Sequence, residues 1–237
     1  RVDIPFYTKK GYKNHYLGDK FYHQVRYGFR YSDHVYIGIT AEKDTGEPFF
    51  KGYNQKGYDY YSPYLFIRNI KRIHTLAIGN YRLNYGCGLI LNTGFGMGKT
   101  ASLSTLGNVS RGIKKHSSTD EYNYFQGIAV SYKLSKRWTT DVFYSYRKMS
   151  GSVDNQFITS LKKDGYYRTE TDFEKRNQLS NQLIGSNIHY NGTYYEWGIT
   201  SVYNVFNKVL NSPVRYYNMY YPRGKDFLNW GINYKLF

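Results

Sequence analysis

Apolar and polar residues alternate along much of the chain. Between residues 21 and 31, Val25, Tyr27, Phe29 and Tyr31 fall on one side of an extended chain, and polar or small residues fall on the other. This period of two is typical of a β-strand with one apolar face. The pattern predicts nine strands, which span residues 19–31, 35–42, 62–70, 74–85, 122–134, 138–147, 181–190, 193–206 and 227–237.

Tight hairpins are expected at four places: residues 32–34, 71–72, 135–137 and 191–192. Three of them predict a register, because pairing must bring apolar faces together. Asn191-Gly192 is also a strong hairpin signal in itself. The predicted partners are Tyr31 with Val35, Phe29 with Ile37, Val130 with Val142, Ile128 with Tyr144, Ile188 with Tyr195 and Ile184 with Ile199. Near residues 71–72, both faces of the predicted strands carry apolar and polar residues, so the pattern predicts no register for this hairpin.

Long connections separate these hairpins, over residues 43–61, 94–121, 148–180 and 207–226. Strict alternation of short and long connections is typical of outer-membrane barrels, which have short periplasmic turns and long extracellular loops. The pattern therefore predicts an all-β fold, an antiparallel transmembrane β-barrel or part of one, over residues 1–237. A soluble β-sandwich or lectin-like domain is the alternative, because its strands also alternate apolar and polar residues.

Composition narrows the class of protein further. The chain has 30 Tyr, 14 Phe and 3 Trp among its 237 residues, an aromatic content that argues against disorder and suits the aromatic girdles of a barrel. No apolar run is long enough for a spanning helix. The one cysteine, Cys87, forms no internal disulfide.

The formal net charge is +16. Seven charged residues fall on polar strand faces and are the expected lumen-lining residues: Arg26, Arg30, Glu42, Lys133, Asp141, Arg147 and Glu196. Other charges form basic loop patches, among them Lys114, Lys115, Lys162 and Lys163. Such patches attract anionic lipid, acidic polysaccharide or nucleic acid.

Signals for chemistry are weak. Thr93–Thr100 ends in Gly-Lys-Thr, but Thr93 replaces the first glycine of a phosphate-binding loop. The six histidines lack metal-ligand spacing, so no cofactor or metal is expected. A membrane-embedded hydrolase using Asp141, His189 and Ser186 is the weakest alternative.

Two further expectations concern residues 166–179 and the chain ends. Thr169 or Thr171 is expected to cap a short helix with Glu174 in its first turn. Nine strands is an odd number, whereas bacterial single-chain barrels have even numbers. Either residues 2–7 close the barrel or a strand follows Phe237. Because Phe237 falls on the polar face of its strand, we expect the natural polypeptide to be longer.

Several stretches resemble the barrel region of Bacteroidota outer-membrane proteins that carry a competence-type helix-hairpin-helix segment. The resembling stretches are residues 18–22, 40–50, 79–89, 94–99 and 165–170. The resemblance implies an outer-membrane location and supplies no catalytic residue. The DNA-binding label of that family belongs to the helix-hairpin-helix segment, which these 237 residues do not show.

The sequence thus predicts a non-enzymatic protein of a Gram-negative outer membrane, a channel or a structural subunit of an assembly. Its expected partners are outer-membrane lipid and other outer-membrane or periplasmic proteins. A DNA-binding or DNA-uptake component is the chief alternative.

Overall fold

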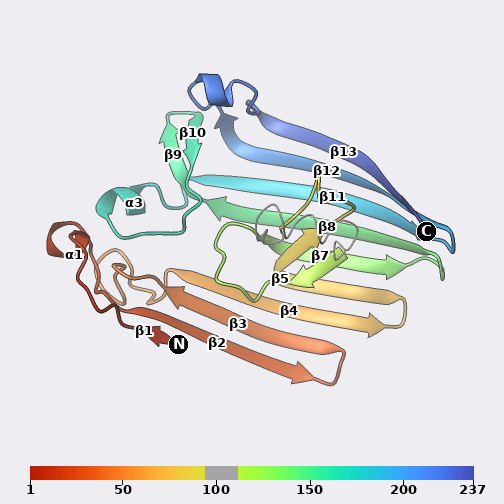
Figure 1. Cartoon of the computed structure of the whole chain (residues 1–237), viewed down its shortest axis with the longest axis horizontal. Coiled ribbons are helices and arrows are strands. Elements are labelled where there is room, and N and C mark those ends of the chain that lie inside the picture. Colours follow the sequence, from red (N-terminus) through yellow and green to blue (C-terminus); the bar gives the residue numbers. More distant parts are fainter. Residues whose placement is uncertain (94–111) are drawn as a thin grey trace.

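The computed structural model describes residues 1–93 and 112–237. Within them one large β-sheet dominates (Figure 1). Its nine long strands are β2 (Tyr22–Tyr31), β3 (Val35–Lys43), β4 (Tyr60–Ile70), β5 (Ile73–Asn84), β7 (Phe125–Lys133), β8 (Trp138–Met149), β11 (Leu179–Asn191), β12 (Tyr195–Leu210) and β13 (Gly224–Leu236). Each matches one strand predicted from alternation, so the all-β prediction is confirmed.

The long strands follow one another across the sheet, and each pairs with the next in antiparallel fashion. The sheet is open in the described part of the chain. One border is β2 with the two-residue strand β1 (Val2–Asp3), and the other is β13 (Figure 1). Residues 2–7 therefore do not join β13; only Val2 and Asp3 pair, and they pair with β2.

Two of the predicted registers are confirmed. Tyr31 pairs with Val35 and Phe29 with Ile37, while Val130 pairs with Val142 and Ile128 with Tyr144. The hairpin near residues 71–72 is present and joins Ile70 to Ile73.

The register predicted at Asn191-Gly192 is wrong by four residues. Ile188 pairs with Ile199, and Asn191 pairs with Glu196. Neither Asn191 nor Gly192 has the positive φ that a two-residue type I′ turn requires, and the Gly192 N–H donates to the Tyr195 carbonyl oxygen instead (3.0 Å). An even shift keeps the faces unchanged, because the side-chain period is two.

Short and long connections alternate as predicted. The tight turns β2–β3, β4–β5, β7–β8 and β11–β12 lie at one end of the sheet, which we call the turn end. Most of the longer segments gather at the other end, the loop end (Figure 1). They include the helices α1 (Gly11–Asn14) and α3 (Glu170–Glu174), the short 3-10 helix η1 (Tyr216–Asn218), and the hairpin of β9 (Gly151–Asp154) and β10 (Phe157–Leu161).

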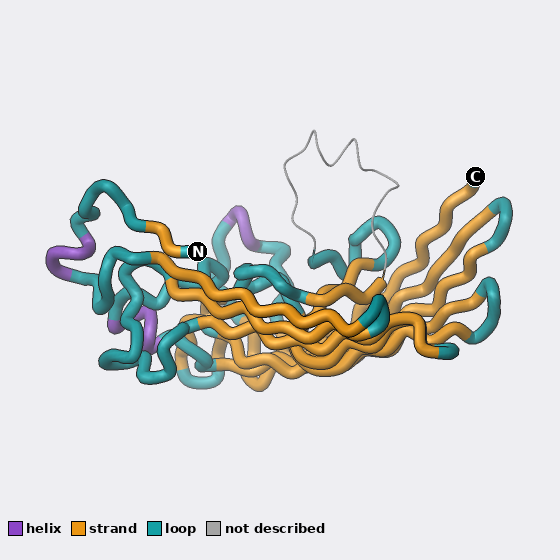
Figure 2. The backbone as a smooth tube through the Cα atoms, turned by 90° about the horizontal axis from the view of Figure 1, so that it is seen from below, coloured by secondary structure: helices purple, strands orange, loops and turns teal. Residues whose placement is uncertain are grey.

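Alternation did not predict a short two-stranded ribbon that lies over one face of the sheet. We call it the ribbon; it consists of the end of β5 and the strand β6 (Gly112–Lys115). The last residues of β5, Tyr81–Asn84, leave the strand pairing with β4 and pair with β6. The departure follows Gly79, which has φ +91° and where a Cβ would lie 2.5 Å from the Pro63 carbonyl oxygen. Figure 2 shows the sheet edge-on, with strand and loop segments above one face only.

Helix α3 begins as expected but with different partners. The Thr169 side chain accepts from the Asp172 N–H, and Asp172 accepts from the Thr169 N–H, so the two form a capping box. Glu174 is the last residue of the helix rather than part of its first turn. The prediction of Thr169 as a cap is confirmed, and the position of Glu174 was wrong.

The two faces of the sheet differ in burial. We call the face that carries the ribbon the inner face and the opposite face the outer face. Phe66, Ala77, Ala129, Phe143 and Val202 on the inner face are buried against Leu83, Tyr85, Leu91 and Ile113 from the ribbon and its neighbouring loop. The outer face has no covering layer among the described residues, and its apolar side chains are exposed.

Candidate functional site

The outer face is uncharged over most of its height. Register aligns its side chains into rows that cross β8, β11, β12 and β13. Starting from the turn end, the rows are Trp138, Tyr190, Trp197 and Tyr234; Thr140, Ile188, Ile199 and Ile232; Val142, Ser186, Ser201 and Trp230; and Tyr144, Ile184, Tyr203 and Leu228. These rows contain no ionisable side chain other than tyrosine. Exposure of this face to water is therefore energetically unfavourable.

Aromatic side chains border this apolar face at the turn end. Trp138 contacts Tyr190 and Trp197 with ring centroids 5.1 and 5.2 Å apart, and Tyr190 contacts Tyr195 at 5.5 Å. All three tryptophans of the chain, including Trp230, belong to the outer face. Amphipathic rings in such a row are favoured at a membrane–water boundary.

Charge returns to the outer face only toward the loop end. The next row contains Tyr146, Gln182, Val205 and Asp226, and Lys148 pairs with Ser180 beyond it. The stretch from Trp138 to Tyr146 contains nine residues. A tilted transmembrane β-strand needs about 9–11 residues to cross the hydrocarbon core.

No helix in residues 1–93 and 112–237 has the length and apolar character needed to cross a membrane.

All seven residues expected to line a lumen lie on the inner face by strand parity. Glu42, Asp141 and Arg147 are buried. Arg26, Arg30 and Lys133 are exposed, and Glu196 is half-buried. Arg30 forms an ion pair with Asp33. The lumen-lining role itself stays a prediction, because the sheet is open.

The hydrolase residues do not form one site. Asp141 and His189 line the same inner-face pocket, but Ser186 pairs with Val142 and Ser201 on the outer face. Among the described residues, no group of three or more His, Cys, Asp or Glu side chains has an arrangement that holds a metal ion. Apart from Thr93, the Thr93–Thr100 stretch lies outside the described residues.

The predicted basic patches lie in different surroundings. Lys114 and Lys115 belong to β6 of the ribbon rather than to a loop, and the Lys115 Nζ lies 5.1 Å from the Tyr36 ring centroid and 5.3 Å from that of Tyr64. At the loop end, Lys162 forms ion pairs with Asp164 (2.9 Å) and Asp172 (2.8 Å). Lys163 lies over the Tyr122 ring at 5.3 Å.

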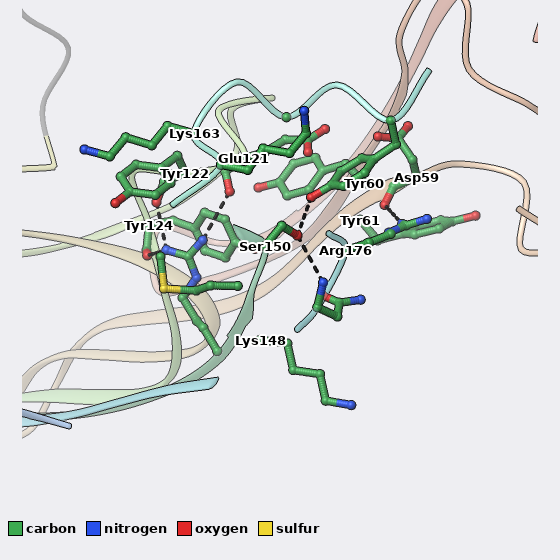
Figure 3. Close-up of a pocket in the computed structure, with 16 residues that line it drawn as sticks. Asp59, Tyr60, Tyr61, Glu121, Tyr122, Tyr124, Lys148, Ser150, Lys163 and Arg176 are labelled. Carbon is green, nitrogen blue, oxygen red and sulfur yellow. Dashed lines mark hydrogen bonds between the residues drawn. The ribbon is translucent and has the colours of Figure 1, made fainter. Parts of the chain in front are cut away.

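A polar pocket of ≈ 180 Å³ lies at the loop end, where three connecting segments meet (Figure 3). Arg147 from β8 organises it. The guanidinium donates to the carbonyl oxygens of Tyr122 (2.7 Å), Tyr124 (2.5 Å) and Glu121 (3.1 Å), and its carbon lies 3.8 Å from the Tyr124 ring centroid. These contacts hold the segment before β7 against the sheet.

Buried carboxyl groups line the same region. Glu47 is fully buried, accepts from the backbone N–H groups of Tyr167 (2.6 Å) and Asp44 (2.8 Å), and so ties two connecting segments together. Burial, with Glu47 as the strongest neighbouring charge, raises the pKa of Glu121 to about 9. The same causes raise the pKa of Asp59 well above its usual range. A Glu121 carboxyl that is protonated at neutral pH reduces the repulsion between these segments.

His116 forms a second buried link at this end. Its Nδ1 accepts from the Arg82 Nε–H (2.9 Å), so its Nε2–H faces the Tyr60 hydroxyl and the Asp120 carbonyl oxygen, both at 3.0 Å. Burial and the charge of Arg82 lower the pKa of His116 to about 4, which keeps the ring neutral. Sequence reasoning missed Glu47, Asp59, His116 and Glu121. The first two lie in one connecting segment and the last two in another segment far along the chain, and they share no motif.

No family model, curated protein or solved structure matches this chain.

Proposed function

We propose that this chain is a non-enzymatic structural subunit embedded in the outer membrane of a Gram-negative bacterium, where its sheet forms part of an antiparallel barrel. The observation that carries the proposal is the outer face. Its rows of Ile, Val, Leu, Trp and Tyr are open to solvent in the isolated chain, whereas charged side chains are placed on the inner face.

This distribution reverses that of a soluble sheet. A soluble antiparallel sheet buries its apolar face and exposes the polar one, and contiguous apolar patches on soluble monomers rarely exceed about 300–600 Å². Here Ile184 is 53% exposed and Val142 is 54% exposed, in the middle of long central strands. Hydrocarbon tails of a lipid bilayer are the simplest covering for such a face.

In this proposal the turn end faces the periplasm and the loop end faces the cell exterior, as in known barrels. The aromatic row of Trp138, Tyr190, Trp197 and Tyr234 would then lie at the periplasmic boundary of the bilayer. The interlocked segments around Arg147 and Glu47 would form a folded cap outside the membrane.

The ribbon favours a structural role over an open channel. Leu83, Tyr85 and Ile113 pack onto the inner face and occupy space that an open pore would need. A channel remains the second candidate function because Arg26, Arg30 and Lys133 are exposed on the same face, and rings of basic side chains select anions in pores.

Fractionation and conductance test the proposal together. We expect the chain in outer-membrane fractions, resistant to extraction by carbonate and high salt, and without steady conductance after reconstitution into planar bilayers. Steady anion-selective conductance would replace the structural role with the channel. Recovery of a folded chain in the soluble fraction would refute the membrane location.

A further inference from the structure

A cavity of ≈ 480 Å³ lies between the inner face of the sheet and the ribbon. Residues of β4, β5 and β7 line it on the sheet side, and residues of β6 line it on the ribbon side. Phe66 of β4 and Ile113 of β6 belong to one buried cluster, which fixes the ribbon against the sheet at this place. Since β4, β5 and β7 are each paired on both sides, the cavity lies away from both borders of the sheet.

The charged groups around this cavity are all bases. Arg68 comes from β4, His74 from β5, and Lys114 and Lys115 from β6. No aspartate or glutamate lines the cavity among the residues that the structure describes. Asp141 faces the same side of the sheet but lines a neighbouring pocket. We call this cavity the basic cavity.

Further contacts concentrate positive charge here. The Lys115 Nζ lies over the Tyr36 and Tyr64 rings of the inner face, and the charges of Arg68 and Lys133 both act on the His74 ring. Like charges at close range repel one another, and the repulsion is stronger where water is partly excluded. An anion bound between these groups would relieve it.

The polar groups of the basic cavity suit an anion with several oxygen acceptors. Arg68 offers a planar fork of donors, and a lysine ammonium group only donates. Thr75, Ser117 and Ser131 add hydroxyl groups to the lining. Phosphate groups match this set, because they carry up to two negative charges and accept hydrogen bonds at each free oxygen.

The size of the basic cavity indicates the size of its ligand. Binding sites for small molecules commonly have volumes of about 300–1,000 Å³, and this cavity falls within that range. Its location also bears on the source of the phosphate. The inner face lies opposite the apolar rows, so in the proposed membrane location a lipid headgroup would lie on the other side of the sheet.

We propose that the basic cavity binds a soluble, phosphorylated small molecule, and that Arg68 and Lys115 contact its phosphate groups. This inference goes beyond the structural role proposed above. The cavity itself needs only the sheet and the ribbon, whereas the choice of a soluble ligand over a lipid headgroup rests on the proposed membrane location.

Calorimetric titration of the natural protein, purified in folded form in detergent micelles, tests the site with pyrophosphate as the probe. We expect saturable binding of pyrophosphate, and no such binding of chloride. Arg68→Gln and Lys115→Gln should each weaken binding by about 10–100-fold, the effect of losing a hydrogen bond from a charged group. Both side chains are exposed, so the variants should fold.

The matched control is Lys136→Gln. Lys136 is exposed in the turn between β7 and β8, at the turn end, and does not line the basic cavity. Its loss removes the same charge from the protein and should change the affinity by less than about twofold. Pyrophosphate should also raise the unfolding temperature of the wild type and of Lys136→Gln more than that of Arg68→Gln, because only a ligand of the folded state stabilises it.

Four results would overturn the proposal. Absence of saturable pyrophosphate binding would remove the site, and equal weakening by Arg68→Gln and Lys136→Gln would reduce it to diffuse surface charge. Competition by phosphatidylglycerol added to the micelles would make the ligand a lipid headgroup. Much tighter binding of a single-stranded oligonucleotide to the same residues would make it a nucleic acid. Failure of the membrane location is distinguishable, because the protein would then be recovered in the soluble fraction with its pyrophosphate binding intact.

Discussion

The ring of Tyr85 stacks on the ring of Phe143, with centroids 5.8 Å apart and planes inclined by 18°. Tyr85 follows the ribbon strand of β5, and Phe143 lies in the middle of β8 on the inner face. Both rings are buried, Phe143 to 1% exposure. This contact anchors the ribbon to the sheet and fills part of the inner face.

Removing the Phe143 ring should therefore destabilise the protein. We expect Phe143→Ala to lower the free energy of unfolding by about 3–5 kcal/mol, because a buried aromatic leaves a cavity. Denaturant titration in detergent micelles measures this. Val142→Ala, the adjacent residue on the outer face, is the control and should cost about 1 kcal/mol or less. Equal effects of the two substitutions would contradict the assignment of the faces.

A charged residue on the outer face should destabilise the protein strongly only where that face lies near the bilayer midplane. We expect Ile184→Lys to lower the free energy of unfolding in lipid vesicles by about 2–4 kcal/mol, the cost of lysine near the bilayer midplane. Gln182→Lys is the matched control, since Gln182 lies on the same strand and face but closer to the loop end. Its cost should be about 0–1 kcal/mol. Equal tolerance of both lysines would argue that this face does not meet hydrocarbon.

The loop-end cap should weaken as the pH rises. Folding raises the pKa of Glu121 from its ordinary 4.5 to about 9, so the folded cap binds this proton more tightly than the unfolded chain does. Its contribution is fully present below pH 4.5 and is lost as the pH rises toward 9. We expect protease cleavage within residues 44–59 and 116–124 to increase over this range.

Glu121→Gln should reduce that increase, because the amide stays neutral at every pH. The control is Glu174→Gln on the exposed last turn of α3, which should leave the pH profile unchanged. A wild-type cap that becomes more protease-resistant between pH 5 and pH 9 would contradict the protonated state of Glu121.

The capping box of α3 gives a local test. Thr169→Ala removes the side chain that accepts from the Asp172 N–H, and loss of such a cap costs about 0.5–2 kcal/mol. We expect faster hydrogen exchange at the first amides of α3, measured by mass spectrometry, with little change in the central strands. Thr171→Ala, inside the same helix, should change the exchange much less. Equal exchange in both variants would show that Thr169 contributes no cap.

Local patterns predicted the strands well because alternation is a local property of the chain. The hairpins at residues 32–34 and 135–137 were predicted in the correct register, since short turns leave few ways to align two apolar faces. The hairpin at Asn191-Gly192 was misaligned because its dipeptide suggested a turn type that the backbone does not adopt.

The ribbon and the loop-end pocket could not be predicted in the same way. Ribbon formation depends on the bend after Gly79 and on contacts such as Tyr85 with Phe143, which are 58 positions apart. The loop-end pocket and its surroundings bring together Glu47 and Glu121 from two connecting segments and Arg147 from the end of β8. No short-range pattern marks such residues, because their burial is decided by how distant segments pack.

Quenching of tryptophan fluorescence tests the central claim most directly, because Trp138, Trp197 and Trp230 all lie on the outer face. The protein is reconstituted into vesicles whose lipids carry bromine at defined depths in the acyl chains. We predict strong quenching, with Trp230 quenched most by deep bromines, and Trp138 and Trp197 quenched most by shallow ones. Single-tryptophan variants, with phenylalanine at the other two positions, separate the signals. Fluorescence that is unaffected by bromine at any depth would contradict a membrane-embedded outer face.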